Sequence, residues 1–383
     1  MKLVVAALTT VLVFAVLAAA CGSPAAAPVP SGSAESKPAA DIPSAASGQF
    51  ARAGTMKEAR ISHAALLLPD GRVLVVGGRG KGVGHTAVIH KTAELYDPAT
   101  GLWARTGEMA EERELPAIAL LQGGRVLAAG GIGNHGTVKG TAELWDPATG
   151  TWRPTGAMKE ARREFGLVTL KDGRVLAVGG KDKTFKFLAS VEVYDPATGT
   201  WSDAAPMAVA RALHTTTLLD DGRGLAVGGG KFDGPYLASA EVYDPATDAW
   251  SSAGTMSASR ALHTATLLKD GRVLVVGGRG KRTSAEIWDP VSNTWTPAGN
   301  TASPRADHTA ALLSDGRVLV VGGVGKLTSA EVFDPASGAW SPTGSMFEPR
   351  YRFAATTLRD GRVLVSAGQS TDSVLAEAEL YTP

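Results

Sequence analysis

The sequence predicts an all-β protein in which one unit of four antiparallel strands recurs seven times and closes into a ring. A segment typified by Met256–Trp295 recurs every 45 to 53 residues from Phe50 to the C-terminus. Each copy holds strand-like runs separated by turn residues, and a unit this thin must stack on its neighbours to bury its faces. The last copy is one strand short, and the N-terminal segment holds a matching piece.

Each strand of the typical unit is predicted from its own residues. Ala261–Leu268 is rich in Thr and Leu and has the length of a strand. Asp270-Gly271 tolerates the positive φ of a tight hairpin turn. In the segment Arg272–Val276, the four residues after the arginine form a continuous apolar run, as expected of a strand buried on both faces. After a variable loop, Ser284–Asp289 has the alternating residue character of a third strand. Trp295 begins a fourth, outer strand.

Four markers recur in the seven units. A double glycine ends the second strand at Gly77, Gly130, Gly179, Gly228, Gly277 and Gly322, with Ala367-Gly368 as a degenerate seventh copy. Arginine heads the first strand at Arg60, Arg113, Arg162, Arg211, Arg260, Arg305 and Arg350. Glutamate lies in the third strand at Glu94, Glu143, Glu192, Glu241, Glu286, Glu331 and Glu379. An aromatic residue follows each glutamate by two positions.

A double glycine, then Glu-x-aromatic, then Trp, at about 50 residues per unit, resembles the kelch repeat of β-propellers. The resemblance covers residues 50–383 and implies a seven-bladed propeller of four-stranded blades as a single domain. A WD40 propeller is the alternative, because Trp145-Asp146 and Trp288-Asp289 match its dipeptide. The other units place Tyr or Phe before that Asp, which favours kelch.

The two ends of the chain are predicted to meet in the last blade. The final unit ends at Tyr381-Thr382-Pro383, directly after its third strand. The segment Phe50–Met56 (FARAGTM) aligns with Trp103–Met109 (WARTGEM) of the first complete unit. We therefore expect a strand starting at Phe50 to complete blade seven and to remove its exposed edge.

Residues 1–20 are typical of a targeting segment rather than of the fold. Lys2 is followed by an apolar run to Leu17, and Ala18–Ala20 precedes Cys21. The end of this segment resembles a bacterial lipoprotein signal, which implies lipidation of Cys21, and an ordinary cleavage signal with an incidental cysteine is the alternative. Cys21 is the only cysteine, which excludes intrachain disulfides.

Residues 21–49 are rich in Ala, Pro and Ser and are predicted to be a disordered tether. The expected location is the cell envelope, with the chain lipid-anchored on the periplasmic or extracellular side. The net charge of +1 argues against a nucleic-acid partner. A monomer is expected.

The loops between the second and third strands are predicted to carry ligand recognition. They share one face of a propeller with the segments that precede each first strand, and we call this the loop face. These loops are basic, and the candidate ligand-binding residues in them are Lys181, Lys183, Arg279, Lys281 and Arg282. We expect an anionic partner, either an acidic protein segment or an anionic glycan. The alternative is that these cations only solubilise the face.

The seven first-strand arginines allow two interpretations. In kelch proteins that bind acidic peptides, arginines at this position reach the ligand, so the resemblance makes Arg60, Arg113, Arg162, Arg211, Arg260, Arg305 and Arg350 candidate ligand-binding residues. The other interpretation is structural. Seven arginines match seven glutamates, and a buried charge must be paired. The histidines three positions later, His63, His214, His263 and His308, are expected to pack between blades.

Two further charged patterns have no predicted catalytic role. Three loop histidines, His85, His90 and His135, could in principle bind a metal, but no spacing brings them together and we expect solvated side chains. On the opposite face, Arg72 and its equivalents are expected to pair with Asp97 and its equivalents as exposed ion pairs of little energetic value.

No cofactor, metal or catalytic residue is predicted. The galactose oxidase radical cofactor needs a cysteine cross-linked to a tyrosine, and the only cysteine is Cys21. The segment Asp195–Trp201 lacks the glycine spacing of a sialidase Asp box. A carbohydrate-active enzyme, such as a kelch-type sialic-acid epimerase or lyase, is the alternative to a binding module. An active site would need polar residues that break the repeat in the central funnel, and no isolated acid/base pair stands out.

Overall fold

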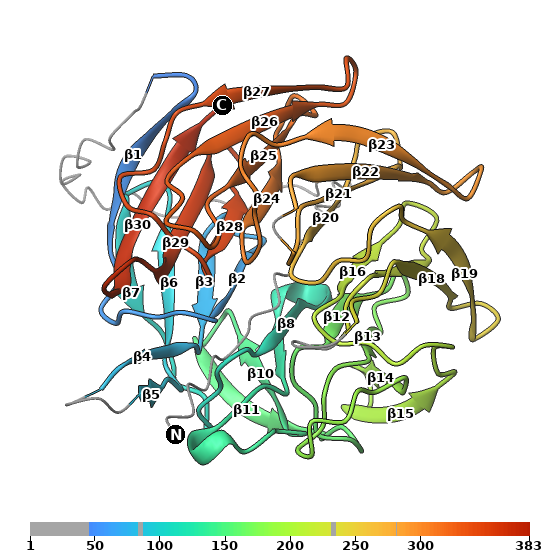
Figure 1. Ribbon diagram of the computed structural model, residues 1–383. Helices are drawn as coiled ribbons and strands as arrows, with labels where there is room; N and C mark the ends of the chain where they lie inside the picture. The colour runs from blue at the N-terminus through green and yellow to red at the C-terminus, as the bar shows by residue number, and fades with distance from the viewer. Residues whose placement is uncertain (1–45, 83–86, 231–234, 281) are drawn as a thin grey trace, which may run out of the picture.

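The computed structural model describes residues 46–82, 87–230, 235–280 and 282–383. Seven four-stranded antiparallel sheets follow one another around a ring (Figure 1). The innermost strands contact their neighbours in the order β2, β8, β12, β16, β20, β24 and β28, and β28 contacts β2. The prediction of an all-β, seven-bladed propeller is confirmed.

The blades use consecutive strands. Blade one contains β2 (Ala64–Leu67), β3 (Val73–Val76), β6 (Ala93–Asp97) and β7 (Leu102–Arg105). Blade two contains β8 (Ala117–Leu120), β9 (Val126–Ala129), β10 (Ala142–Asp146) and β11 (Thr151–Thr155). Blade three contains β12 (Gly166–Thr169), β13 (Val175–Val178), β14 (Val191–Asp195) and β15 (Thr200–Ala204). Blade four contains β16 (Thr215–Leu218), β17 (Gly224–Val227), β18 (Ser239–Asp244) and β19 (Ala249–Thr255).

The remaining blades follow the same order. Blade five contains β20 (Thr264–Leu267), β21 (Val273–Val276), β22 (Ser284–Asp289) and β23 (Thr294–Asn300). Blade six contains β24 (Thr309–Leu312), β25 (Val318–Val321), β26 (Ala330–Asp334) and β27 (Ala339–Thr343). Blade seven contains β28 (Ala354–Thr357), β29 (Val363–Gln369), β30 (Val374–Thr382) and β1 (Gln49–Thr55).

Strand β1 closes the ring, as the sequence predicts. It pairs antiparallel with β30, with Phe50 opposite Tyr381, and the two ring centroids lie 5.1 Å apart. The strand begins at Gln49, one residue before its expected start. Because β1 covers the outer edge of β30, the last blade has the same four strands as the other six.

The core lies between adjacent sheets. The second strand is fully buried in six blades, and in blade seven all of it but Gln369 is buried, which explains why these strands are continuous apolar runs rather than alternating ones. The Trp of an outer strand packs on the aromatic residue of the third strand, as Trp103 does on Tyr96 at 5.0 Å. The Trp103 indole N–H also donates to Ala53 O in the preceding blade, at 2.9 Å.

Two features were not predicted. The first loop between second and third strands holds an extra hairpin of β4 (Arg79–Lys81) and β5 (Ala87–Ile89). Short 3-10 turns occur at η1 (Gln122–Gly124) and η2 (Asn134–Gly136). Among the residues described, no helix has the length and apolar character needed to cross a membrane.

Candidate functional site

All seven first-strand arginines are buried and paired with the glutamate of their own blade. In blade five, Arg260 Nη2 lies 2.6 Å from Glu286 Oε1, and Arg260 Nη1 donates to Gly277 O and Ser284 O at 2.8 Å. The equivalent ion pairs are Arg60–Glu94 at 2.9 Å, Arg113–Glu143 at 3.1 Å, Arg162–Glu192 at 2.7 Å, Arg211–Glu241 at 2.6 Å, Arg305–Glu331 at 2.9 Å and Arg350–Glu379 at 2.5 Å. The structural interpretation of these arginines is the one observed.

The pairs fasten each blade at the loop face. The second oxygen of Glu286 accepts from Ser257 N at 2.8 Å, so one carboxylate ties the third strand to the segment before the first strand. Contact between these arginines and a ligand stays a prediction. It would require the pairs to open, and breaking a buried pair leaves an uncompensated charge.

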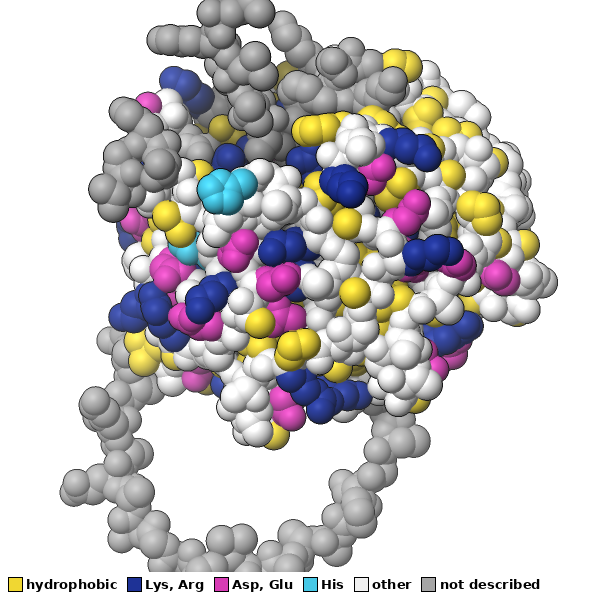
Figure 2. Space-filling view, turned by 90° about the horizontal axis from the view of Figure 1, so that it is seen from below, with side chains coloured by type: hydrophobic (Ala, Val, Ile, Leu, Met, Phe, Trp, Pro, Cys, Tyr) yellow, Lys and Arg dark blue, Asp and Glu magenta, His cyan; other side chains and the backbone are white. Residues whose placement is uncertain are grey.

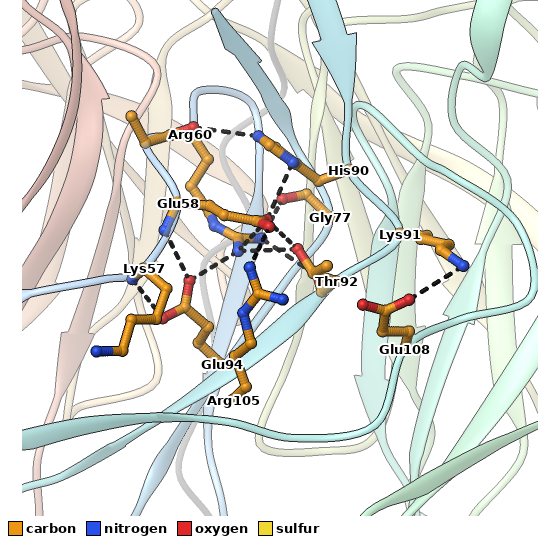
Figure 3. A network of polar contacts seen from close by, with 11 residues as sticks. Lys57, Glu58, Arg60, Gly77, His90, Lys91, Thr92, Glu94, Arg105 and Glu108 are labelled. Atoms are coloured by element: carbon orange, nitrogen blue, oxygen red, sulfur yellow. Dashed lines mark hydrogen bonds and ion pairs between the residues drawn. The ribbon is translucent and has the colours of Figure 1, made fainter. Parts of the chain in front are cut away.

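Blade one extends its pair with a second carboxylate (Figure 3). Glu58 lies 3.3 Å from Arg60, 2.7 Å from Arg105 and 3.1 Å from His90 Nδ1. Burial raises the pKa of Glu58, but the hydrogen bond from Thr92 and the charges of His90 and both arginines outweigh it and lower that pKa overall. His90 is therefore half-buried in a polar network, against Glu58 and Ala59 O, rather than solvated, contrary to expectation, and burial lowers its pKa.

The remaining loop histidines do not join His90. His135 is exposed, and His85 lies outside the described residues. In the part of the chain that the structure describes, no three His, Cys, Asp or Glu side chains form a group that could hold a metal ion.

The histidines after each arginine pack between blades, as predicted. His63 Nε2 lies 3.0 Å from Ser366 Oγ of blade seven. His263 and His308 contact the threonines of the preceding blade, Thr215 and Thr264, each at 3.1 Å. Burial lowers the pKa of His63, and likewise that of His214 and His308, to about 3, so these imidazoles are neutral at physiological pH.

A ring of strained backbone surrounds the central axis of the propeller at its loop face. We call it the mouth ring, and it consists of Ser62, Leu115, Glu164, Leu213, Leu262, Asp307 and Arg352, each two positions after a paired arginine. All seven have φ between +53° and +59°. Such values are uncommon for residues other than glycine. Backbone N–H groups of the ring donate to the preceding blade, as Leu115 N does to Ser62 O at 2.9 Å.

The mouth ring has a uniform backbone but varied side chains, and several are charged. With their neighbours they form what we call the mouth cluster, made of Arg79, Glu114, Arg163, Glu164, Lys181, Arg279, Asp307 and Arg352. Three ion pairs connect it: Lys181–Glu164 at 2.9 Å, Arg79–Glu114 at 3.5 Å and Arg279–Asp307 at 3.8 Å. The cluster holds five cations and three carboxylates.

Several groups of the mouth cluster lack hydrogen-bond partners. Asp307 is 1% exposed, and neither carboxylate oxygen accepts a hydrogen bond within the described residues. Burial raises the pKa of Asp307 to about 6, against the lowering effect of Arg352 and Arg279. Burial likewise raises the pKa of Glu114. The guanidinium of Arg352 makes no ion pair within 4 Å in the described structure, and it lies over the ring of Tyr351 at 5.7 Å.

The opposite side of the mouth is apolar. Leu213 and Leu262 of the mouth ring, with Ala212 and Ala261 beside them, are buried in one hydrophobic cluster, and Phe187, Tyr236 and Val324 pack against it. We call Ala212, Leu213, Ala261 and Leu262 the apolar arc. A cavity adjoins the charged side, lined by residues of the inner strands together with three mouth-ring residues, Ser62, Leu115 and Glu164.

The predicted loop cations differ in their environments. Lys183 is exposed and Arg282 is half-buried, whereas Lys181 is buried against Glu164 and over the Phe187 ring at 4.9 Å. Lys281 and Cys21 lie outside the described residues. Arg279 belongs to the mouth cluster. The predicted loop set therefore contains two members of the mouth cluster, Lys181 and Arg279.

The expected pairing of Arg72 with Asp97 is wrong. Arg72 pairs with Asp70 in its own turn at 2.7 Å, because Asp70 also accepts from Arg72 N and holds the two side by side. Asp97 instead accepts from Ala99 N. On the side of the molecule shown in Figure 2, cations and anions are interspersed. Pairs of this exposed kind contribute little stability.

We expected no isolated acid/base pair to stand out from the repeat, and this expectation missed the charged groups of the mouth cluster. The sequence nevertheless marks their positions. The positions one and two after the paired arginine read Ala-Leu in blades four and five, and they depart to Glu114, Arg163-Glu164, Asp307 and Arg352 elsewhere. Only the ring geometry shows that these departures converge.

Comparisons with known proteins agree with this architecture. The Kelch motif family matches residues 162–208, 220–257 and 305–347. No curated protein matches the sequence. Among solved structures, a fungal alcohol oxidase described as showing catalytic diversity among the AA5 family, in complex with copper, superposes with a TM-score of 0.69 at 19% identity. The match covers 88% of this chain and 76% of that one. At this identity the likeness concerns the fold alone. The chain is a kelch-repeat β-propeller.

Proposed function

We propose that this propeller is an envelope-anchored binding module whose loop face recognises an anionic ligand, an acidic protein segment or an anionic glycan. A kelch propeller is suited to an interaction module, because a rigid scaffold presents variable loops on one face. The observation that carries the proposal is the charge of the mouth cluster, in which five cations accompany three carboxylates. Lys183, Lys186 and Lys326 are exposed on loops of the same face.

The excess positive charge is positioned for a ligand. Arg163 and Arg352 have no carboxylate partner within 4 Å in the described residues, and Arg163 stacks on the exposed Phe185 ring at 4.5 Å. Arginine binds carboxylates and phosphates through its planar fork. An anionic ligand at the mouth would therefore supply the acceptors that these two guanidinium groups lack.

Binding of the full chain to arrays of acidic peptides and anionic glycans, at low and high salt, tests this function. We expect salt-sensitive binding that the double change Arg163→Gln and Arg352→Gln reduces. The matched control is Arg174→Gln, which removes an exposed cation on the turn face and should leave binding intact. Loss of binding in the control, with retention in the double variant, would place the site on the wrong face.

Anchoring rests on the N-terminal sequence. A lipid on Cys21 would hold the chain at a membrane, and the tether would let the propeller face its partners. Changing Cys21 to Ser should release the protein from the membrane fraction. Retention of that variant on membranes washed with high salt contradicts the lipid anchor.

A carbohydrate-active enzyme of the epimerase or lyase type is the second candidate. It is favoured by Asp307 and Glu114, whose pKa values are raised by burial, because catalytic acids and bases are commonly tuned in this way. Following the anomers of an acidic sugar by NMR with wild type and Asp307→Asn distinguishes turnover from binding. Turnover lost in Asp307→Asn supports the enzyme, and no turnover in wild type rejects it for that sugar.

A further inference from the structure

The loop of residues 181–188 in blade three presents an aromatic ring to solvent on the loop face. Phe185 is 67% exposed, whereas Phe187, two positions later, packs against the apolar arc. The loop is therefore anchored by one phenylalanine and leaves the other outside. A single exposed hydrophobic residue is ordinary on a protein surface and by itself indicates nothing. Two further properties of the loop distinguish Phe185 from such a residue.

The first property is a strained but well-fixed backbone. Phe185 has φ of +66°, in the left-handed region that bulky residues rarely adopt and that glycine accepts without cost. The turn is held by Asp182, whose Oδ1 accepts from Thr184 N and Oγ1 at 2.7 Å and from Lys186 N at 3.0 Å. Strain of this kind is concentrated at binding and catalytic sites. The turn thus keeps a phenylalanine where glycine would be easier to accommodate.

The second property is the positive charge around the ring. The Arg163 guanidinium lies over the Phe185 ring at 4.5 Å. Lys183 and Lys186 flank Phe185 in the sequence, are exposed, and form no ion pair with the described residues. Phe185 therefore stands among three cations.

The adjoining segment adds apolar surface in place of an acid. Residues 207–211 lead into blade four, and their backbone donates to Leu188 O at 3.1 Å and Ala189 O at 2.9 Å, at the base of the loop. Two positions before the paired arginine, blades one, two, three and seven carry glutamate, whereas blade four carries Val209, which is 37% exposed. We define the blade-three corner as Arg163, Lys183, Phe185, Lys186 and Val209.

We propose that the blade-three corner docks an acidic segment of a partner protein, with one apolar side chain of that segment packed against Phe185. This rests on the proposed function and selects, among its anionic ligands, a protein segment. Carboxylates on both sides of an apolar side chain complement the cations around Phe185, and aromatic and arginine side chains dominate the energetics of protein interfaces. An anionic glycan fits less well, because its hydroxyls need fixed polar partners and the Thr184 hydroxyl already donates to Asp182.

Calorimetric titration of the full chain with acetyl-Glu-Asp-Leu-Asp-Glu-amide tests the proposal. Two control peptides replace the leucine by serine, or the four acids by glutamine and asparagine. We expect the serine peptide to bind about 10-fold more weakly, because it loses the apolar contact. The uncharged peptide should bind about 10- to 100-fold more weakly at low salt. Equal affinity for the leucine and serine peptides overturns the proposal.

The variant Phe185→Gly separates binding from structure. Glycine removes the ring and accepts the positive φ, so the melting temperature should stay the same or rise. The difference between the leucine and serine peptides should disappear. The matched control is Val291→Ser, which removes an exposed apolar side chain on the turn face and should preserve that difference. A lower melting temperature with unchanged peptide discrimination would make Phe185 a structural residue and overturn the proposal.

Tetragalacturonate and phosphatidylglycerol vesicles test the other occupants of the corner. If either binds in a manner that Phe185→Gly abolishes, while the leucine peptide does not bind, a glycan or a membrane surface replaces the protein segment. If Arg352→Gln weakens peptide binding and Phe185→Gly does not, the anionic function stands at the mouth and the corner is rejected. If no anionic probe binds, both are rejected.

Discussion

The seven Arg–Glu pairs and the mouth cluster lie within a few residues of one another along the chain. Buried charges are closely paired in the first and only loosely paired in the second. Each repeated arginine meets a glutamate at 2.5 to 3.1 Å and two backbone carbonyls besides. In the mouth cluster, Asp307 lies 3.8 Å from the Arg279 guanidinium and accepts no hydrogen bond from the described residues. Within the described residues, none of the seven paired glutamates has a buried oxygen without a hydrogen-bond partner, whereas both oxygens of Asp307 lack one.

This difference distinguishes the residues that hold the blades together from the residues of the candidate site. A satisfied buried pair needs nothing further and recurs in every blade, because every blade must fasten its own edge. Among the described residues, buried carboxylate oxygens without a hydrogen-bond partner occur only where the repeat is broken, at Glu114, Glu164 and Asp307. The following predictions compare these two behaviours, starting from the ring that supports both.

Removing β1 should have the largest effect. Deletion of Phe50–Ala53 takes away a buried phenylalanine, worth about 3–5 kcal/mol by itself, and exposes β30 as an edge. We expect a loss of more than about 5 kcal/mol in the free energy of unfolding. Deletion of residues 22–45 is the control and should leave the melting temperature unchanged. Equal melting temperatures for the two truncations would contradict closure by β1.

Breaking a repeated pair should come next. Glu286→Gln keeps the shape but leaves Arg260 without its anion, and we expect a loss of about 3–5 kcal/mol in denaturant unfolding. The exposed pair of Asp270 with Arg272 provides the matched control, since Asp270→Asn should cost less than about 1 kcal/mol. A small effect of Glu286→Gln would mean that the pairs do not fasten the blades.

Mild acid should destabilise the fold through its buried histidines. The pKa values of His63, His214 and His308 fall from 6.5 to about 3 on folding, so their stability contribution is complete above pH 6.5 and declines as the pH falls. From pH 7 to 5.5 each should lose roughly 1 kcal/mol, about 3 in total. Asp307, whose pKa is raised, takes up its proton as the pH falls, and this offsets part of the loss of stability.

A single substitution isolates the histidine effect. Blades three and seven carry Phe165 and Phe353 at the equivalent position, so His308→Phe should fit the fold. Melting curves from pH 7 to 5.5 should show a shallower decline for this variant than for wild type. Parallel curves would show that other groups cause the acid sensitivity.

Replacing Asp307 of the mouth cluster by a neutral residue should have the smallest effect on the free energy of unfolding. It should raise this free energy rather than lower it. A pKa raised from 3.8 to about 6 means that charged Asp307 opposes folding at pH 7.5, and that this penalty disappears as the pH falls toward 4. Asp307→Asn should therefore gain about 1–3 kcal/mol at pH 7.5 and little at pH 4.5. A loss of stability at pH 7.5 would place Asp307 with the scaffold pairs instead of the site.

Local sequence patterns account for most of the fold. Turn glycines, apolar second strands and the match of FARAGTM with WARTGEM each lie within a short stretch, and together they sufficed to predict seven blades and closure by β1. The equal numbers of Arg and Glu also predicted the buried pairs, since an unpaired buried charge is too costly to recur. The mistaken pairing of Arg72 arose because a local Asx turn competes with cross-strand proximity.

By itself, therefore, the sequence determined what each blade repeats, because hydrophobic period and turn chemistry act over short stretches of chain. The mouth cluster was decided only by the tertiary structure. Glu114, Glu164, Asp307 and Arg352 come from four different blades and are far apart along the chain. Ring closure brings them around one axis, and burial then gives Asp307 its raised pKa. Convergence and desolvation depend on the packing of all seven blades, and no single repeat contains them.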